Sequence, residues 1–315
     1  MVTITQLEYI LAVDTHRHFG KAADACHVSQ PTLSMQIQKV EEEFGFPLFD
    51  RQKKPILPTD KGRVFIEQAK TLLREHKKLV TIGNSNSGDL TGTFRLGIIP
   101  TLAPYLLPLF IDRFSKKYPK VDLTIDELKT DSIAQQLKED QLDGGILATP
   151  LEIKGLTETP LFYEPFQLYL SKNHPLLKKN QIKQDDLDGS EMWLLKDGHC
   201  FRNQVVQFCS LRSEPQIYKN IHFEGGTLET LKLLVKKGTG YTLVPYLFSA
   251  SLDEKERKDV IREFTSPIPT REVSLVVRRD QWKTEILKAI EATILESIPQ
   301  NLIKKDKKQL LLDIC

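Results

Sequence analysis

The chain has 315 residues, with 44 lysines and arginines against 42 aspartates and glutamates, so its formal net charge is only +2. A hydrophobic share of 40% and a charged share of 27% are ordinary for a globular protein and exclude a disordered, collagenous or membrane-embedded chain. The length predicts more than one domain, because a single hydrophobic core usually stops growing at about 250–300 residues.

The sequence indicates neither a signal peptide nor a membrane span. Its first residues lack the basic region and apolar core that a secretory signal needs. The longest uncharged run, residues 96–111, contains Pro100, Pro104 and Pro108 and is shorter than the roughly 20 apolar residues that cross a bilayer. We therefore expect a cytoplasmic protein with no membrane partner, whose four cysteines are reduced by default.

Residues 1–60 carry three apolar stripes at helical spacing. The third stripe has spacings of 4, 3 and 4 and consists of Leu33, Ile37, Val40 and Phe44. We expect all four to be buried on one helix face, with Ser29 as the N-cap, Pro31 in the first turn and Gly45 at the end. Two short helices joined by a tight turn are typical of a helix-turn-helix, and residues 48–58 predict a two-stranded wing.

The opposite face of the third helix is the candidate DNA-reading surface. Three acidic residues at its C-terminal end would repel phosphates, so base reading should lie in the first two turns. The candidates are Gln30, Pro31, Thr32, Ser34, Gln38 and Lys39 on the helix, and Arg51 and Lys53 on the wing. Arg51 has an alternative interpretation as a structural wing residue with a buried partner. Residues 1–50 hold three basic against seven acidic side chains, so several subunits should share one site on double-stranded DNA.

Residues 61–90 predict a dimerising linker helix and a hinge. Thr59 or Asp60 can cap this helix. A heptad-like seam comprises Phe65, Ala69, Leu72, His76 and Leu79, with Ile66, Leu73 and Val80 recurring every seventh residue. Such a seam favours a dimer, and the open alternative is an amphipathic helix packed on its own domain. We place the domain boundary in the polar, glycine-containing run 84–92.

Beyond residue 91, strand-like and helix-like segments alternate, which predicts α/β architecture with largely parallel sheets. The expected strands are 94–99, 121–128, 145–148, 166–170, 192–195, 242–244 and 273–277, and the expected helices follow Thr101 and Thr130 and cover 202–209, 227–237 and 281–297. We expect a regulatory domain over 91–302 in two lobes with a cleft between them. Lobe I should cover about 91–163 and 268–302, and lobe II about 164–267. A basic tail, 303–315, should be a solvated end.

The ordered motif of residues 19–34 resembles LysR-type transcriptional regulators. It reads FGKAADACHVSQPTLS and is followed by Glu41, Gly45, the Leu-Phe-Asp-Arg of 48–51 and the Thr-Asp-Lys-Gly of 59–62. The resemblance continues in the His-Pro-Leu of 174–176 and in residues 238–245. Asp140 stands where the family often has glycine, and we expect no functional consequence. The resemblance implies a winged helix-turn-helix, a linker helix and a two-lobed domain similar to periplasmic binding proteins, in a dimer or tetramer.

The segment Asp197-Gly198-His199-Cys200, followed by Cys209, is similar to the hydrogen-peroxide-sensing members of that family. The resemblance implies that hydrogen peroxide oxidises Cys200 to a sulfenic acid, which Cys209 resolves as an intramolecular disulfide that a thiol reductant resets. It also implies that Thr101, Thr130 and His199 bind peroxide, and that Arg271 favours the thiolate form of Cys200. Taken singly, the threonines could be helix caps and Arg271 a surface ion-pair residue.

The spacing of the two cysteines constrains the switch. On a continuous helix, nine residues rise about 13.5 Å, whereas a disulfide needs Cα atoms about 4.4–6.8 Å apart. Oxidation must therefore unwind residues 201–208. The open alternatives are that Cys209 is a core cysteine and Cys200 a bystander, that the protein is a LysR-type regulator sensing a small metabolite in the cleft, or that it is a thiol peroxidase. The helix-turn-helix weighs against an enzyme. No cofactor is expected, and a zinc site is disfavoured because a second ligand pair is missing.

Overall fold

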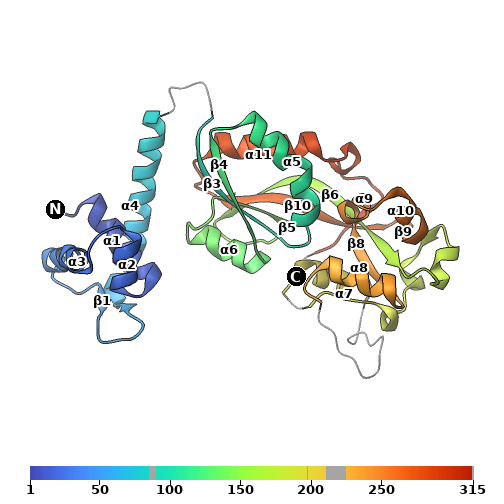
Figure 1. Ribbon diagram of the computed structural model, residues 1–315, viewed down its shortest axis with the longest axis horizontal. Coiled ribbons are helices and arrows are strands. Elements are labelled where there is room, and N and C mark those ends of the chain that lie inside the picture. The colour runs from blue at the N-terminus through green and yellow to red at the C-terminus, as the bar shows by residue number, and fades with distance from the viewer. Residues whose placement is uncertain (85–89, 197, 211–224, 314–315) are drawn as a thin grey trace. The chain divides into compact units, whose positions relative to one another are not determined.

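The computed structural model describes residues 1–84, 90–196, 198–210 and 225–313. The chain divides into two compact units, Met1–Gly88 and Asp89–Cys315, which are described separately (Figure 1). Asp197 of the cysteine motif, Cys315 and residues 85–89 of the predicted connection lie outside the described residues. Over the described part of the chain, no helix combines the length and apolarity needed to cross a membrane.

The first unit is a winged helix-turn-helix followed by a long helix. Its elements are α1 (Ile4–His16), α2 (Phe19–Ala25), α3 (Gln30–Phe44), β1 (Phe49–Asp50), β2 (Leu57–Pro58) and α4 (Asp60–Asn84). The Ser29 hydroxyl caps α3 by accepting the Thr32 N–H at 3.3 Å, and Gly45 ends it with a φ of 72°. The Thr59 hydroxyl caps α4 through the Gly62 N–H at 3.0 Å. These contacts confirm the predicted caps and the wing, whose two strands pair antiparallel.

The apolar stripe of α3 is buried except at its last member. Leu33, Ile37 and Val40 are fully buried, but Phe44 is 47% exposed, so its predicted burial is wrong. Phe44 is the last residue before the chain turns away at Gly45. Its ring lies at the surface, 5.1 Å from the ring centroid of Phe65.

Helix α4 has one buried face and one exposed apolar face. Ile66, Ala69 and Leu73 are buried in the core of this unit, as the alternative to dimerisation expects. Leu72, Leu79 and Val80 are about half-exposed or more. The dimerising role of the exposed residues stays a prediction.

The second unit is built on a sheet that is mixed rather than largely parallel. Its strands are β3 (Gly92–Ile98), β4 (Val121–Glu127), β5 (Gly144–Thr149), β6 (Leu156–Leu170), β7 (Gln181–Ile182), β8 (Tyr241–Pro245), β9 (Ile261–Phe264), β10 (Ile268–Arg278) and β11 (Gln309–Leu311). The strand order is β4-β3-β5-β10-β6-β9-β7. β3 pairs in parallel with β4 and β5, but β10 runs antiparallel to β5 and β6. The prediction of largely parallel sheets is therefore wrong.

Strand β6 belongs to both halves of this unit. Its part Leu156–Pro165 pairs with β10, and its part Phe166–Leu170 pairs with β8 and β9. Figure 1 shows β6 and β10 running from the half that carries α5, α6 and α11 to the half that carries α7 to α10. The two long antiparallel strands connect the halves directly, whereas parallel neighbours would need a crossover. The residue limits of the lobes stay predictions.

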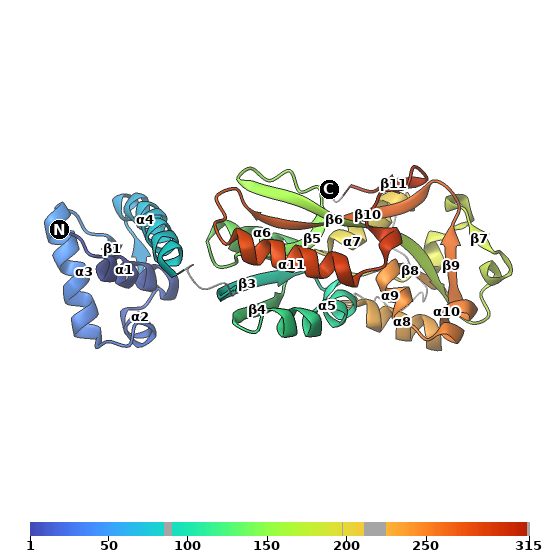
Figure 2. The same cartoon turned by 90° about the horizontal axis from the view of Figure 1, so that it is seen from above.

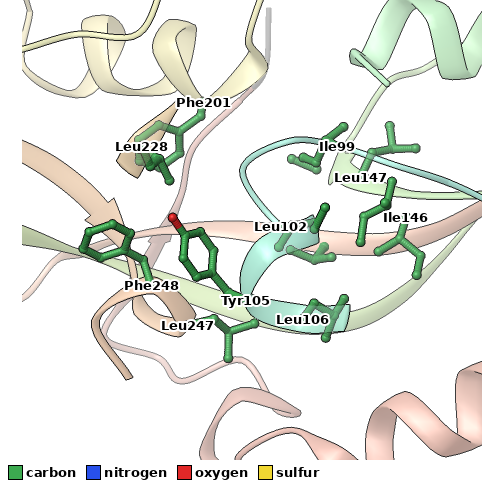
Figure 3. Packing of buried hydrophobic residues seen from close by; sticks show 14 of the residues in the cluster. Ile99, Leu102, Tyr105, Leu106, Ile146, Leu147, Phe201, Leu228, Leu247 and Phe248 are labelled. Atoms are coloured by element: carbon green, nitrogen blue, oxygen red, sulfur yellow. The ribbon is translucent and has the colours of Figure 1, made fainter. Parts of the chain in front are cut away.

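The helices of the second unit cover both halves of the sheet (Figure 2). They are α5 (Ala103–Lys117), α6 (Thr130–Lys138), α7 (Cys200–Phe208), α8 (Leu228–Lys237), α9 (Tyr246–Ala250), α10 (Glu254–Val260) and α11 (Thr284–Ser297). The predicted strand at 192–195 is wrong, because only single bridges from Met192 to Tyr241 and from Leu195 to Gly225 occur there. One continuous apolar core runs through the unit, and Figure 3 shows the part where Tyr105 of α5 lies beside Phe248 of α9.

The C-terminal segment is more ordered than predicted. Residues 304–308 are exposed, as expected for a solvated basic run. The chain then returns to the sheet, where β11 pairs in parallel with residues Ile268, Pro269 and Thr270 of β10. Leu312 is buried, whereas Leu310 stays exposed. The predicted free, solvated end is therefore wrong for the pairing of residues 309–311 and for the burial of Leu312.

The packing of the wing on α4 makes Gly62 intolerant of a side chain. A Cβ atom at Gly62 would lie 2.0 Å from the backbone oxygen of Leu48. We expect Gly62→Ala to lower the free energy of unfolding by about 1–3 kcal/mol through overpacking, measured by thermal unfolding of the full chain. The exposed neighbour Arg63, changed to alanine, should leave the melting temperature unchanged. Equal melting temperatures for both variants would contradict this account.

Candidate redox site and DNA-binding surface

The two cysteines of the motif stand at opposite ends of α7. Cys200 is its first residue and is buried, and Cys209 is its C-cap. Both are free thiols. The predicted helix between them is thus confirmed, and it separates the cysteines by about 13.5 Å along its axis. A thiol in the first turn of a helix lies where the macrodipole favours an anion.

The Cys209 thiol is much less acidic than an exposed thiol. Burial raises the pKa of the Cys209 thiol to about 12. At neutral pH it is therefore protonated, and it is not a nucleophile while α7 stays folded.

Arg271 lies in a buried ion pair with Glu164. The two residues are directly opposite each other in the register of β10 and β6, and both side chains are 0% exposed. Arg271 donates to Glu164 Oε2 from Nη2 at 2.7 Å and from Nε at 2.9 Å. The interpretation of Arg271 as a surface ion-pair residue is therefore wrong.

The same guanidinium donates hydrogen bonds to Thr101 and contacts the Phe201 ring in the first turn of α7. Arg271 Nη1 donates to the Thr101 hydroxyl oxygen at 2.8 Å, and Nη2 donates to the Thr101 carbonyl at 3.2 Å. Since that hydroxyl oxygen accepts from arginine, its own hydrogen is left to donate to another acceptor. The Phe201 ring centroid lies 5.4 Å from Arg271 Cζ, a cation–π contact that ties Arg271 to the residue after Cys200.

Thr101 and Thr130 follow two neighbouring strand ends. Strands β3 and β4 end side by side, with Leu128 N–H donating to the Ile98 carbonyl at 2.9 Å. Thr101 and Thr130 follow these two strand ends, and both are buried. They are not helix caps, because the N-cap residues are Leu102 and Lys129.

Lys129 brings a positive charge to the turn before Cys200. Its Nζ would lie 2.7 Å from a Cβ atom on Gly198. Burial first, and then the charges of Lys129 and Lys196, lower the pKa of His199. The His199 imidazole is therefore neutral at pH 7 and can exchange hydrogen bonds without carrying a charge.

The structure brings two of the predicted redox residues, Thr101 and Arg271, into direct contact. Arg271 also contacts Phe201, the residue after Cys200, and Lys129, the residue before Thr130, lies beside Gly198. The peroxide-binding roles of Thr101, Thr130 and His199 stay predictions. Glu164 and Lys129 were not predicted. A glutamate inside the otherwise apolar and aromatic run 161–166 was the available signal for Glu164, because a buried carboxylate needs a partner. Among the described residues, no group of three or more potential metal-ligating side chains occurs.

The predicted DNA-reading residues form an exposed surface at the start of α3. Gln30, Pro31, Thr32, Gln38 and Lys39 are exposed, and Ser34 is half-buried. The Thr32 hydroxyl lies 2.8 Å from that of the capping residue Ser29. Gln38 donates to Glu42 at 2.9 Å.

Arg51 joins the wing to α3. Its Nη2 donates to Glu41 Oε2 at 2.9 Å, and its Nη1 lies 3.4 Å from the Ser34 hydroxyl. Its guanidinium lies over the Phe19 ring at 5.1 Å. These contacts favour the structural interpretation of Arg51. Lys53 lies in the wing, 3.9 Å from the Asp50 carboxylate.

Two family models together match nearly the whole chain. Residues 4–63 match the bacterial regulatory helix-turn-helix protein of the lysR family. Residues 87–298 match the LysR substrate binding domain.

Similar proteins share both units. A hydrogen peroxide-inducible genes activator of Pectobacterium carotovorum is 38% identical, covering 88% of this chain and 90% of that protein. The DNA-binding transcriptional dual regulator OxyR of Escherichia coli K12 is 39% identical, covering 88% and 90%. A full-length OxyR variant from Pseudomonas aeruginosa has 30% identity and a TM-score of 0.77, covering 95% of this chain and 99% of that one.

The raised pKa of Cys209 predicts slow alkylation. In a Cys200→Ser variant, iodoacetamide at pH 8 should modify Cys209 at least about a hundredfold more slowly in the native protein than in urea, because the thiolate is scarce. Between pH 7 and 10 the native rate should rise about tenfold per unit without levelling. Mass spectrometry of the labelled peptide gives the rate. A plateau near pH 9 would show that the thiol is not shifted.

Proposed function

The chain belongs to the LysR family of bacterial regulatory helix-turn-helix proteins, and on this premise we propose that it regulates transcription in response to hydrogen peroxide through Cys200 and Cys209. One observation carries the proposal: a buried cysteine begins a helix that ends at a second cysteine, and the residue after the first cysteine, Phe201, contacts Arg271 of a buried cluster with Thr101 and Glu164. The likeness to hydrogen peroxide-inducible activators supports it.

In the first step, the Cys200 thiolate attacks one oxygen of hydrogen peroxide. The S–O bond forms, the O–O bond breaks, and hydroxide leaves and is protonated to water. The sulfur is oxidised to a sulfenic acid. The Thr101 hydroxyl, which accepts from Arg271, donates to the peroxide, and neutral His199 and Thr130 help to orient it.

In the second step, the Cys209 sulfur attacks the sulfenic acid. The S–S bond forms, the S–O bond breaks, the thiol proton joins the leaving hydroxide, and a second water is released. One peroxide and two thiols thus become one disulfide and two waters. A dithiol reductant restores the two thiols by thiol–disulfide exchange and is itself oxidised to a disulfide.

The second step requires α7 to unwind, because its helical length cannot meet disulfide geometry. Several contacts must then break. The Phe201 ring packs on Phe166 at 4.8 Å, and the Phe208 ring packs on Phe264 at 5.2 Å. Unwinding also removes the burial that keeps Cys209 protonated, so the resolving thiol becomes reactive only when the helix opens.

The C-terminal strand is attached to the same helix. Gln204 of α7 is fully buried, and its Nε2 donates to the Leu312 carbonyl at 2.9 Å. Its Oε1 has no hydrogen-bond partner among the described residues, which makes its burial costly. Leu312 N–H in turn donates to the Thr270 carbonyl at 2.9 Å. Unwinding α7 should therefore loosen β11 and carry the change to β10.

The exposed start of α3 is the proposed DNA-reading surface, and the exposed apolar face of α4 is the proposed subunit contact. Leu72, Leu79 and Val80 on α4 would be covered in a dimer, and pairs of dimers could form a tetramer. Several DNA-binding units, each with more acidic than basic side chains in residues 1–50, would then share one operator.

We expect Gln30→Ala to weaken specific DNA binding, because each good base contact is worth about 1–3 kcal/mol. The matched control is Gln36→Ala on the same helix, since Gln36 accepts from Gln6 of α1 at 3.0 Å and does not belong to the predicted reading surface. Operator titrations at fixed salt, with thermal unfolding as a fold check, measure both. Equal affinity of the Gln30 variant and the wild type would count against this surface.

Oxidation should expose two segments together. After one equivalent of peroxide, amide hydrogen exchange should increase in α7 and in β11, while β3 and β4 stay protected. Gln204→Ala should loosen β11 in the reduced protein already, whereas Gln207→Ala, at an exposed position of the same helix, should not. Unchanged protection of the α7 amides from exchange, in a protein whose disulfide is confirmed by mass, would contradict the refolding step.

A further inference from the structure

Arg271 does not present an isolated positive charge to the site of Cys200. Its Nε and Nη2 are occupied by the Glu164 carboxylate at 2.9 and 2.7 Å. Both side chains are completely buried, so solvent does not screen them. A neighbour of such a pair experiences a dipole, whose field is weaker than that of a single charge at the same distance.

Glu164 is itself fixed from the other side. Its Oε1 accepts the backbone N–H of Leu247, in α9, at 2.7 Å. The carboxylate therefore accepts three hydrogen bonds, and the β6–β10 register places it opposite Arg271. This arrangement determines which guanidinium nitrogen is left for Thr101.

We propose that Glu164 is a positioning residue for the Cys200 reaction, which offsets most of the charge of Arg271 and aims its Nη1 at the Thr101 hydroxyl. The inference rests on the proposed function. Glu164 would then limit the acidity of the Cys200 thiol, and with it the peroxide concentration at which the protein responds. Arg271 would act mainly by orienting Thr101, and less by attracting the thiolate.

Other charged and titratable groups surround the pair and stay unchanged in the test. His199 and Lys196 precede α7, and Lys129 precedes α6. Tyr105 of α5 donates to Glu229 of α8 at 3.0 Å, and both charges of the ion pair act on Tyr105.

A charge cycle tests the proposal with Glu164→Gln, Arg271→Gln and the double variant, in a Cys26→Ser, Cys209→Ser, Cys315→Ser background. The measured quantity is the midpoint of the pH profile for Cys200 alkylation. A unit charge within about 4–6 Å moves such a midpoint by about one to three pH units. Glu164→Gln should lower the midpoint by about one unit or more, Arg271→Gln should raise it, and the double variant should return near the starting value.

Two further variants separate tuning from damage to the fold. Glu164→Asp keeps the charge and should keep the midpoint, although its packing changes. Glu158→Gln removes a carboxylate from the same strand, where Glu158 accepts from Leu151 at 3.1 Å, and should also keep it. An unchanged midpoint in Glu164→Gln, or shifts of the same sign in both single variants, would overturn the proposal.

Peroxide reactivity is measured separately on the same proteins. Glu164→Gln should lower the pH at which peroxide oxidises Cys200 in step with the alkylation midpoint. A charge cycle that behaves as expected in a protein whose Cys200 does not react with peroxide would refute the proposed function and leave the charge coupling standing. A reactive Cys200 with no response to Glu164→Gln would refute the inference alone.

Discussion

The buried pair of Arg271 and Glu164 is the interaction on which the site depends. Removing one partner from such a pair leaves an uncompensated buried charge and typically costs about 3–5 kcal/mol, whereas the intact pair adds little net stability. The pair matters because it fixes the position of the Arg271 guanidinium. Two cross-strand residues fix a guanidinium that holds Thr101, contacts Phe201 and, through Glu164, meets the backbone of α9. Residues from both halves of the second unit therefore contact this one buried ion pair.

Helix α7 is the second constraint, because it cannot coexist with a disulfide between its ends. The reduced protein is held in the helical form by aromatic packing at Phe201 and Phe208 and by the Gln204 contact to Leu312. Burial also keeps the Cys209 thiol protonated, which opposes its attack on the sulfenic acid while α7 stays folded. A chemical change at one sulfur is thereby linked to the packing of a whole segment and, through β11, to the strand that carries Arg271.

The parts of the fold that local sequence determines were predictable. Ser29 and Gly45 mark the ends of α3 because capping chemistry acts within a few residues, and the run between the two cysteines shows its helical character in the same way. The full length of β6 was not predictable. Pro160 and Pro165 interrupt the pattern, and proline is uncommon inside central strands.

The missing members of the site were hidden for a different reason. Glu164 and Arg271 are 107 residues apart, and only the register of β6 with β10 brings them together. Leu312 meets Gln204 across 108 residues, because β11 returns to the sheet after an exposed basic run. Phe44 is exposed because it lies at the end of the helix. Apolar periodicity alone does not indicate where a helix leaves the core.

The most direct test of the account is a non-reducing peptide map of the full chain before and after one equivalent of hydrogen peroxide, without added reductant. We expect one new cross-linked peptide, joining Cys200 to Cys209, with the consumption of one peroxide per chain and no further turnover. Cys26 and Cys315 should stay reduced. A protein that consumes peroxide without forming this link, or a Cys200→Ser variant that still forms a peroxide-dependent disulfide through another cysteine, would contradict the account.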